Sequence, residues 1–128
     1  MRFRRYNGNK YGNTKIRSNG EIFDSKKEYL RFLDLSSLQK AGKITGLKRQ
    51  VKYVLIPAQR EPDQVGPRGG IKKGRILEHE VSYIADFVYT DLETGEEVVE
   101  DTKGIRTKDY ILKRKMMLYF HGIKIREV

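Results

Sequence analysis

Charged residues interrupt the most hydrophobic part of the sequence, YIADFVYTDLETGEEVVEDTKG, at residues 83–104. Asp86 lies among aliphatic and aromatic residues, and Asp101 and Lys103 follow a pair of valines. Two nearby carboxylates repel each other, and burial raises the cost of keeping both charged. A divalent cation offsets that cost, because Mg²⁺ prefers oxygen ligands and commonly uses one or two carboxylates with water and phosphate. These residue types therefore predict metal-assisted hydrolysis, with a structural ion pair or chance as the alternatives.

The segment is expected to fold as a β-hairpin, which fixes the geometry of these charges. Side chains alternate across a strand, so Asp101 and Lys103 share one face. A turn centred on residues 93–94 places Asp86 opposite Asp101, and a turn centred on residues 94–95 places it opposite Lys103. Either register brings Asp86 beside the pair.

Periodicity, caps and turn residues predict the elements that position this hairpin. Ser25 is the expected N-cap of the first helix, and Thr107 and Gly122 are expected to bound the second. The order predicts an α/β fold in which helices flank a central mixed sheet of about four strands (α-β-β-β-α-β). The expected helices cover 23–42 and 107–122, and the expected strands cover 50–58, 79–91, 96–104 and 123–128.

Two segments fall outside this pattern. Residues 59–77 are rich in glycine and proline and are expected to form a long mobile loop or a loose hairpin. Residues 1–20 are basic and form either an ordered arm or a disordered tail. We therefore expect a single domain over 21–128 that follows a basic N-terminal arm.

The composition favours a polyanionic partner. The 128 residues carry a formal net charge of +10 and include no cysteine, which excludes disulfides and thiol catalysis. No apolar run is long enough to span a membrane, and no signal peptide is evident, so a cytoplasmic location is expected. The basic residues expected to contact DNA are Arg2, Arg4, Arg5, Lys10, Lys15, Arg17, Arg106, Lys108, Arg114 and Lys115.

The spacing of Asp86 and Asp101-Thr102-Lys103 resembles the D…(D/E)xK motif of the PD-(D/E)xK nuclease superfamily, with Ala85 where the motif has proline. The expected order of elements agrees with this resemblance, which implies a restriction-endonuclease-like core. Several stretches are similar to a phage and prophage family regarded as Holliday junction resolvase-like endonucleases. These stretches are FDSKKEYLRFLDL, IPAQ, YIADFVY, VVEDTKG and YILKRKMM.

The resemblance implies a role for each matching residue. Asp86, Asp101, the carbonyl of Thr102 and Glu28 would bind Mg²⁺, for which Mn²⁺ would substitute. Lys103 would activate the attacking water. Lys113, on the second helix, would be an auxiliary basic residue near the phosphate, and Glu28, Asp86, Asp101, Lys103 and Lys113 would form the catalytic set.

The resemblance further implies a phage-type endonuclease that resolves branched DNA as a homodimer in the host cytoplasm. A nicking or flap endonuclease and a transposase-type end-cutting subunit are alternatives, as is a catalytically inactive DNA-binding domain. Two residue assignments stay open. Glu100 competes with Asp101 as the metal ligand, and Glu28 fits a capping box with Ser25 as well as a catalytic role.

Overall fold

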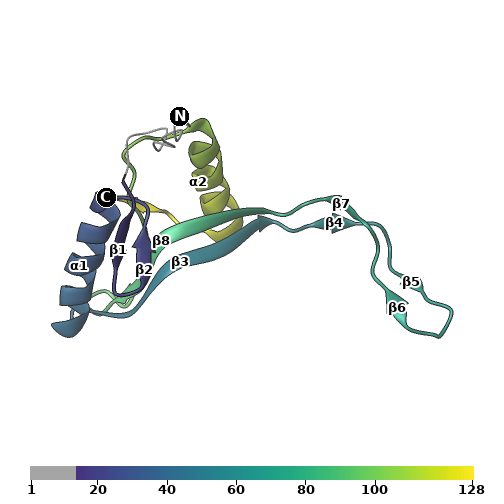
Figure 1. The fold of residues 1–128 in the computed structure, drawn as a ribbon, viewed down its shortest axis with the longest axis horizontal. Coiled ribbons are helices and arrows are strands. Elements are labelled where there is room, and N and C mark those ends of the chain that lie inside the picture. The colour runs from purple at the N-terminus through teal and green to yellow at the C-terminus, as the bar shows by residue number, and fades with distance from the viewer. Residues whose placement is uncertain (1–13) are drawn as a thin grey trace, which may run out of the picture. The chain divides into compact units, whose positions relative to one another are not determined.

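The computed structural model describes residues 14–128, which form two helices and ten strands (Figure 1). Neither helix within this range is both long and apolar enough to cross a membrane. The elements in chain order are β1 (Ile16–Ser18), β2 (Glu21–Phe23), α1 (Lys26–Lys40), β3 (Ile44–Ile56), β4 (Gln59–Arg60), β5 (Gln64–Val65), β6 (Ile71–Lys72), β7 (Ile76–Glu78), β8 (Val81–Asp91), β9 (Glu97–Asp101), α2 (Lys108–His121) and β10 (Arg126–Glu127).

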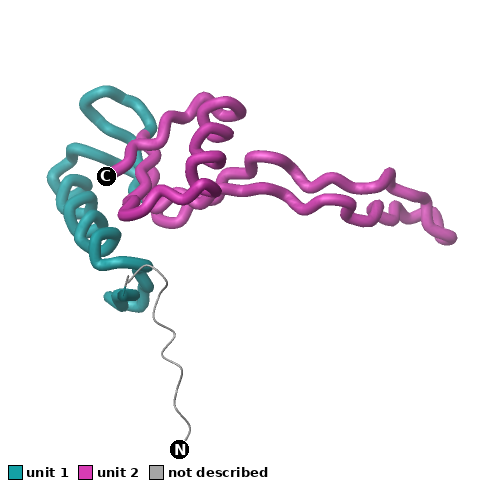
Figure 2. Tube along the Cα trace, turned by 90° about the horizontal axis from the view of Figure 1, so that it is seen from above, with its two compact units in different colours: residues 1–47, 89–97 teal, residues 48–88, 98–128 magenta. Residues whose placement is uncertain are grey.

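A four-stranded sheet in the order β10-β9-β8-β3 is the centre of the fold. Strand β10 runs parallel to β9, with Glu127 beside Asp101, and α2 supplies the crossover that a parallel pair requires. The predicted α/β class, with a mixed four-stranded sheet flanked by helices, is confirmed. The described residues cluster into two compact units, 14–47 with 89–97 and 48–88 with 98–128 (Figure 2).

The first unit contains a β-hairpin that the sequence analysis did not predict. Strands β1 and β2 pair in antiparallel fashion around Asn19 and Gly20, both of which have positive φ angles. Asn-Gly is the preferred dipeptide for such a turn, so the signal was present in the sequence. The expected boundary between arm and domain, after residue 20, falls inside this hairpin.

Helix α1 begins and ends where its capping residues predicted. The Ser25 hydroxyl accepts a hydrogen bond from the Glu28 amide at 3.1 Å, and Gly42 follows the helix with a φ of +75°. Its apolar side is only partly buried, because Leu35 is fully buried whereas three other leucines of the helix are exposed. Those three are Leu30, Leu33 and Leu38.

Helix α2 packs on the sheet of the second unit and closes its core. Thr107 caps the helix by accepting from the Tyr110 amide at 3.1 Å, and Gly122 ends it in the left-handed conformation, as predicted. Met117 is fully buried against the sheet residues. The buried cluster consists of Leu55, Tyr83, Ala85, Val88, Val99, Tyr110, Met117 and Ile125.

Residues 57–80 form a two-stranded ribbon that continues β3 and β8 away from α2 (Figure 1). Strand β4 pairs with β7, and β5 pairs with β6, both in antiparallel fashion. Of the two alternatives that the glycine- and proline-rich segment left open, the structure shows the hairpin.

Truncation of Met117 to alanine should lower the free energy of unfolding by about 2 to 5 kcal/mol, because it removes a fully buried side chain and leaves a cavity. The neighbouring substitution Leu118→Ala is the matched control. Leu118 is 56% exposed, and its loss should change stability by less than about 0.5 kcal/mol. Urea denaturation followed by circular dichroism measures both, and equal losses would contradict the assigned face of α2.

Candidate active site

The carboxylate of Asp101, the last residue of β9, is the centre of the candidate site. Its side chain is only 1% exposed. Tyr83 on β8 donates its hydroxyl hydrogen to Asp101 Oδ2, and Lys103 Nζ lies 3.2 Å from Oδ1. Lys103 is within ion-pair distance, but no donor in residues 14–128 is aligned to form a hydrogen bond with Oδ1. A buried carboxylate oxygen is thus left with acceptor capacity for a ligand.

The surroundings of Asp101 disfavour its charged form. Burial, followed by the negative charge of Asp86, raises the pKa of the Asp101 carboxyl from its ordinary value of 3.8 to about 6. The hydrogen bond from Tyr83 and the positive charge of Lys103 act in the opposite direction. The carboxyl is ionised at neutral pH, in a state that an added cation would stabilise.

Asp86 is fixed in the middle of the neighbouring strand, β8. Its Oδ2 accepts hydrogen bonds from both the amide and the hydroxyl of Thr102, each at 2.8 Å. Gln50 Nε2 lies 3.4 Å from Oδ1. These contacts hold the second carboxylate beside the residue that follows Asp101.

The predicted arrangement of the hairpin charges is confirmed in two respects. Asp101 and Lys103 are neighbours, as strand alternation required. At the turn, the amide of Asp91 donates to the carbonyl of Glu96 at 2.9 Å. A pair of residues 91 and 96 is centred on residues 93–94, the first of the two turns considered. An unbroken hairpin in that register places Asp86 opposite Asp101.

Lys103 is held in place by an aromatic ring as well as by Asp101. Its side chain is 30% exposed, and Nζ lies 4.5 Å from the centroid of the Tyr110 ring, within the range of a cation–π interaction. The Tyr110 hydroxyl donates to Glu127 Oε1 at 3.1 Å. The ammonium group therefore has a defined position and still reaches solvent.

Sequence reasoning did not single out Tyr83 and Tyr110, which were treated as ordinary strand and helix residues. Burial, more than any other cause, raises the pKa of each phenol above its ordinary value. Both phenols therefore stay protonated and act as hydrogen-bond donors at neutral pH. A buried tyrosine usually needs a partner for its hydroxyl, and this was the available signal.

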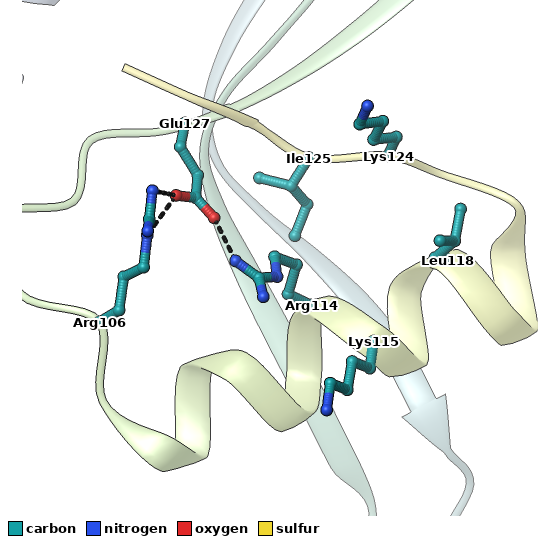
Figure 3. A pocket seen from close by; sticks show the side chains of 7 residues that line it. All are labelled: Arg106, Arg114, Lys115, Leu118, Lys124, Ile125 and Glu127. Atoms are coloured by element: carbon teal, nitrogen blue, oxygen red, sulfur yellow. Dashed lines mark hydrogen bonds and ion pairs between the residues drawn. The ribbon is translucent and has the colours of Figure 1, made fainter.

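Glu127, on β10, was also missed, although it is an acid in an alternating apolar strand, as Asp86 is. Its carboxylate accepts from Arg106 Nε at 2.6 Å and from Arg114 at 2.8 Å (Figure 3). The hydrogen bond from Arg114, followed by those from Arg106 and Tyr110, holds the pKa of Glu127 below its ordinary value. One carboxylate thus orients two guanidinium groups.

The same residues line a pocket of about 430 Å³ beside α2 (Figure 3). Four of its lining side chains are cationic, and Glu127 is the one acid among them. Leu118 and Ile125 supply apolar surface. The predicted DNA-contacting residues Arg106, Arg114 and Lys115 are brought together here, and Lys124, which was not predicted, joins them.

The other predicted basic residues are not gathered into this pocket. Lys113 forms an ion pair with Asp109 at 3.4 Å, one turn earlier in α2, and Lys108 is exposed. Lys15 and Arg17 are exposed, the latter in β1. The remaining four lie outside the described residues and are Arg2, Arg4, Arg5 and Lys10.

Glu28 and Glu100 are both buried. Whether Glu28 is a capping or a catalytic residue, and whether Glu100 or Asp101 is the metal ligand, stay open predictions. Glu28 is 2% exposed at the start of α1 and belongs to the first compact unit, whereas Asp101 belongs to the second. Its participation in the acidic cluster stays a prediction. Glu100 is fully buried, so β9 is covered on both faces near its end.

The donor set can be tested against the expected Mg²⁺. Among residues 14–128, no three His, Cys, Asp or Glu side chains gather into a group that could hold a metal ion. Asp86 and Asp101 supply two neighbouring carboxylates, and the buried Oδ1 of Asp101 faces the ammonium group of Lys103 at 3.2 Å. Mg²⁺ commonly takes one or two protein carboxylates and keeps several waters, so this donor set fits it.

Comparison with known proteins places the chain in a family. Residues 8–127 match the family described as Protein of unknown function (DUF1064), and the chain belongs to this family. No curated protein and no solved structure matches the chain.

In metal-free buffer the parent protein should lose stability relative to Asp101→Asn as the pH rises from about 4 to about 7. A carboxyl whose pKa is raised by folding binds its proton more tightly in the folded state, so stability is highest below the unfolded pKa and is lost as the pH rises through the folded pKa. The rise to about 6 corresponds to on the order of 2 to 3 kcal/mol. Urea denaturation at the two pH values measures the difference.

The substitution Asp109→Asn is the control, because the Asp109 side chain is 76% exposed. It removes a carboxyl without touching Asp101, so a pH-dependent offset shared by both variants would not be specific to Asp101. If Asp101→Asn also keeps a constant offset from the parent, the Asp101 carboxyl has no raised pKa.

Proposed function

We propose that this protein is a Mg²⁺-dependent endonuclease that hydrolyses phosphodiester bonds in DNA. The observation that carries the proposal is the buried carboxylate of Asp101, with Lys103 at 3.2 Å from one oxygen and Asp86 close by. A structural ion pair with Lys103 needs only one acid, Asp101. The negative charge of Asp86, the second acid, raises the pKa of the Asp101 carboxyl. Groups held in such unfavourable states cluster at functional sites.

The side chains around Asp101 have separable tasks in this proposal. Asp86 and Asp101, together with the carbonyl of Thr102, would hold Mg²⁺ or Mn²⁺. Tyr83 occupies Asp101 Oδ2 and fixes the orientation of the carboxylate. A bound Mg²⁺ would lower the pKa of its water and neutralise charge on the phosphate. Lys103 reaches solvent and can donate a hydrogen bond to the attacking water or to a phosphate oxygen.

The pocket beside α2 supports nucleic acid as the substrate. One of its cations, Arg114, lies 6.0 Å from the centroid of the Tyr110 ring, and Lys103 lies over the same ring at 4.5 Å. A track of positive charge thus leads from the acidic pair to the pocket. Such a track suits a phosphodiester backbone, and binding should weaken steeply as salt is added.

Branched DNA, and a four-way junction in particular, is the favoured substrate within this proposal. Cutting two strands placed symmetrically about a junction calls for a C₂ homodimer. The same chemistry would serve a nicking or flap endonuclease or a transposase-type end-cutting subunit. The expected place of action is the cytoplasm, that of the host if the protein is phage-encoded.

A catalytically inactive DNA-binding domain is the alternative from another class. One observation favours it, namely that no three potential metal-ligating side chains gather in residues 14–128. The two classes differ in a single measurement, since only an enzyme converts supercoiled plasmid or junction DNA to products when Mg²⁺ is added.

The substitutions Asp86→Asn, Asp101→Asn and Lys103→Ala should each lower Mg²⁺-dependent cleavage of a four-way junction by about a hundredfold or more. This corresponds to roughly 3 kcal/mol of transition-state stabilisation. The two carboxamides cannot neutralise the metal, and alanine removes the donor to the attacking water. Gel assays on matched linear, flap and four-way substrates measure the rates and rank the substrates.

Glu100→Gln is the matched control, because Glu100 is equally buried beside Asp101. It should cut faster than Asp101→Asn by at least about tenfold. An inactive Glu100→Gln with an active Asp101→Asn would show that Glu100 is the ligand. Full activity of Lys103→Ala would refute the mechanism, and no cleavage by the parent protein on any substrate would favour the DNA-binding alternative.

Glu28→Gln should lower cleavage by about tenfold or more with a near-normal melting temperature, an effect of about 1.4 kcal/mol on the transition state. Glutamine is itself a capping-box residue, so it preserves the helix start but has no charge to offer a metal or its water. Thermal unfolding and cleavage rates together separate the two roles.

Ser25→Ala is the companion variant, since it removes the hydroxyl that accepts from the Glu28 amide. It should lower stability by about 1 kcal/mol and leave the cleavage rate of the folded protein unchanged. If Glu28→Gln cuts as fast as the parent, Glu28 is a helix-capping residue only.

A further inference from the structure

The ribbon over residues 57–80 has no role in the chemistry proposed above. It consists of paired strands, and within residues 14–128 no third strand pairs with them (Figure 1). Backbone hydrogen bonds join its two strands. The Glu61 amide donates to the Arg75 carbonyl at 2.9 Å, and the Gly66 amide donates to the Gly70 carbonyl at 2.7 Å. An isolated hairpin of this kind is marginally stable in water, so additional contacts must hold its shape.

Such contacts brace the ribbon midway along its length. The Gly74 amide donates to Asp63 Oδ1 at 2.9 Å, and Arg60 donates to the Gly74 carbonyl at 3.1 Å. A side chain at Gly74 would lie 1.7 Å from the Glu61 carbonyl oxygen, so the two backbones approach at a distance that only glycine permits. Both acids of this region are engaged within the ribbon, since Glu61 also pairs with Arg75 at 3.4 Å.

Beyond this brace, the tip of the ribbon exposes an aliphatic pair. Val65 on β5 lies opposite Ile71 on β6, and each is 78% exposed. Pro67 lies in the turn between them. Two aliphatic side chains held together at the end of a braced arm are positioned to enter another molecule.

Positive charge surrounds the aliphatic pair. Arg68, Lys72 and Lys73 lie at the tip, and the sequence has no acid between Asp63 and Glu78. The ion pairs of the described chain include none of these three cations. The tip therefore complements a polyanion, whereas a second copy of the same basic tip would be repelled.

We propose that the ribbon tip is a wedge that enters the minor groove of DNA and unstacks a base step with Val65 and Ile71. Aliphatic side chains offer no hydrogen bonds for reading base edges in the major groove, but apolar wedges between base steps are a recurrent means of kinking DNA. Arg68, Lys72 and Lys73 would bind the flanking phosphates. The inference rests on DNA as the partner and is independent of cleavage.

The test uses the full-length protein in EDTA, with junction and duplex DNA that carry 2-aminopurine at single steps. Binding by the parent should raise 2-aminopurine fluorescence at one or a few steps, because unstacking relieves quenching. Val65→Ser with Ile71→Ser should abolish most of this increase and weaken binding by about tenfold. Both side chains are exposed, so the fold is preserved, and circular dichroism checks it.

Two further variants separate the wedge from the phosphate contacts. Leu77→Ser is the matched control, because Leu77 is an exposed aliphatic residue of the same ribbon that lies outside the tip, and it should unstack DNA as the parent does. Arg68→Ala with Lys72→Ala and Lys73→Ala should lower the slope of log affinity against log salt by about 2 to 3.

Equal fluorescence increases for the parent and the Val65→Ser, Ile71→Ser variant would overturn the inference. So would tip variants that change only self-association in analytical ultracentrifugation, which would make a second copy the occupant. If the parent protein unstacks DNA but never cuts it, the nuclease proposal is refuted and the wedge proposal is supported. If the parent cuts DNA without any tip-dependent unstacking, the wedge proposal is refuted and the nuclease proposal is supported.

Discussion

Burial of the Asp101 carboxylate is the constraint on which the contacts of Tyr83, Lys103 and Tyr110 in the second unit depend. An ionised carboxylate is costly to remove from water, and here two partners compensate, one phenol and one ammonium group. The ammonium group of Lys103 is held in turn over the ring of Tyr110, whose hydroxyl binds Glu127. A single chain of contacts therefore links the buried acid of β9 to the last strand of the sheet.

Sequence alone predicted the parts of this arrangement that depend on local periodicity. The two-residue spacing of Asp101 and Lys103 fixes them on one side of a strand whatever the strand packs against. The helix caps at Ser25 and Thr107 depend on side chains that bond amides three residues away, so their effect is also local. Local rules of this kind survive without knowledge of tertiary contacts.

The features that were missed depend on partners distant in sequence, or on a signal that was passed over. Tyr83 acquires its importance from an acid eighteen residues away, and Glu127 from Arg114 on α2 and Arg106 in the loop before it. In α1, the pattern of apolar residues does not indicate that Leu33 is exposed and Glu28 is buried. The turn at Asn19, by contrast, carried its dipeptide signal openly, within a stretch that was treated only as a source of positive charge.

The parallel pairing of β10 with β9 has a consequence for how the site assembles during synthesis. Asp101, Lys103 and both arginines leave the ribosome before Glu127 does, because β10 follows α2 in the chain. Until β10 docks, Arg106 and Arg114 lack the carboxylate that orients them, and the edge of β9 has no neighbour on that side. The nascent chain therefore carries Asp101 and Lys103 before it carries the strand that orients the two arginines.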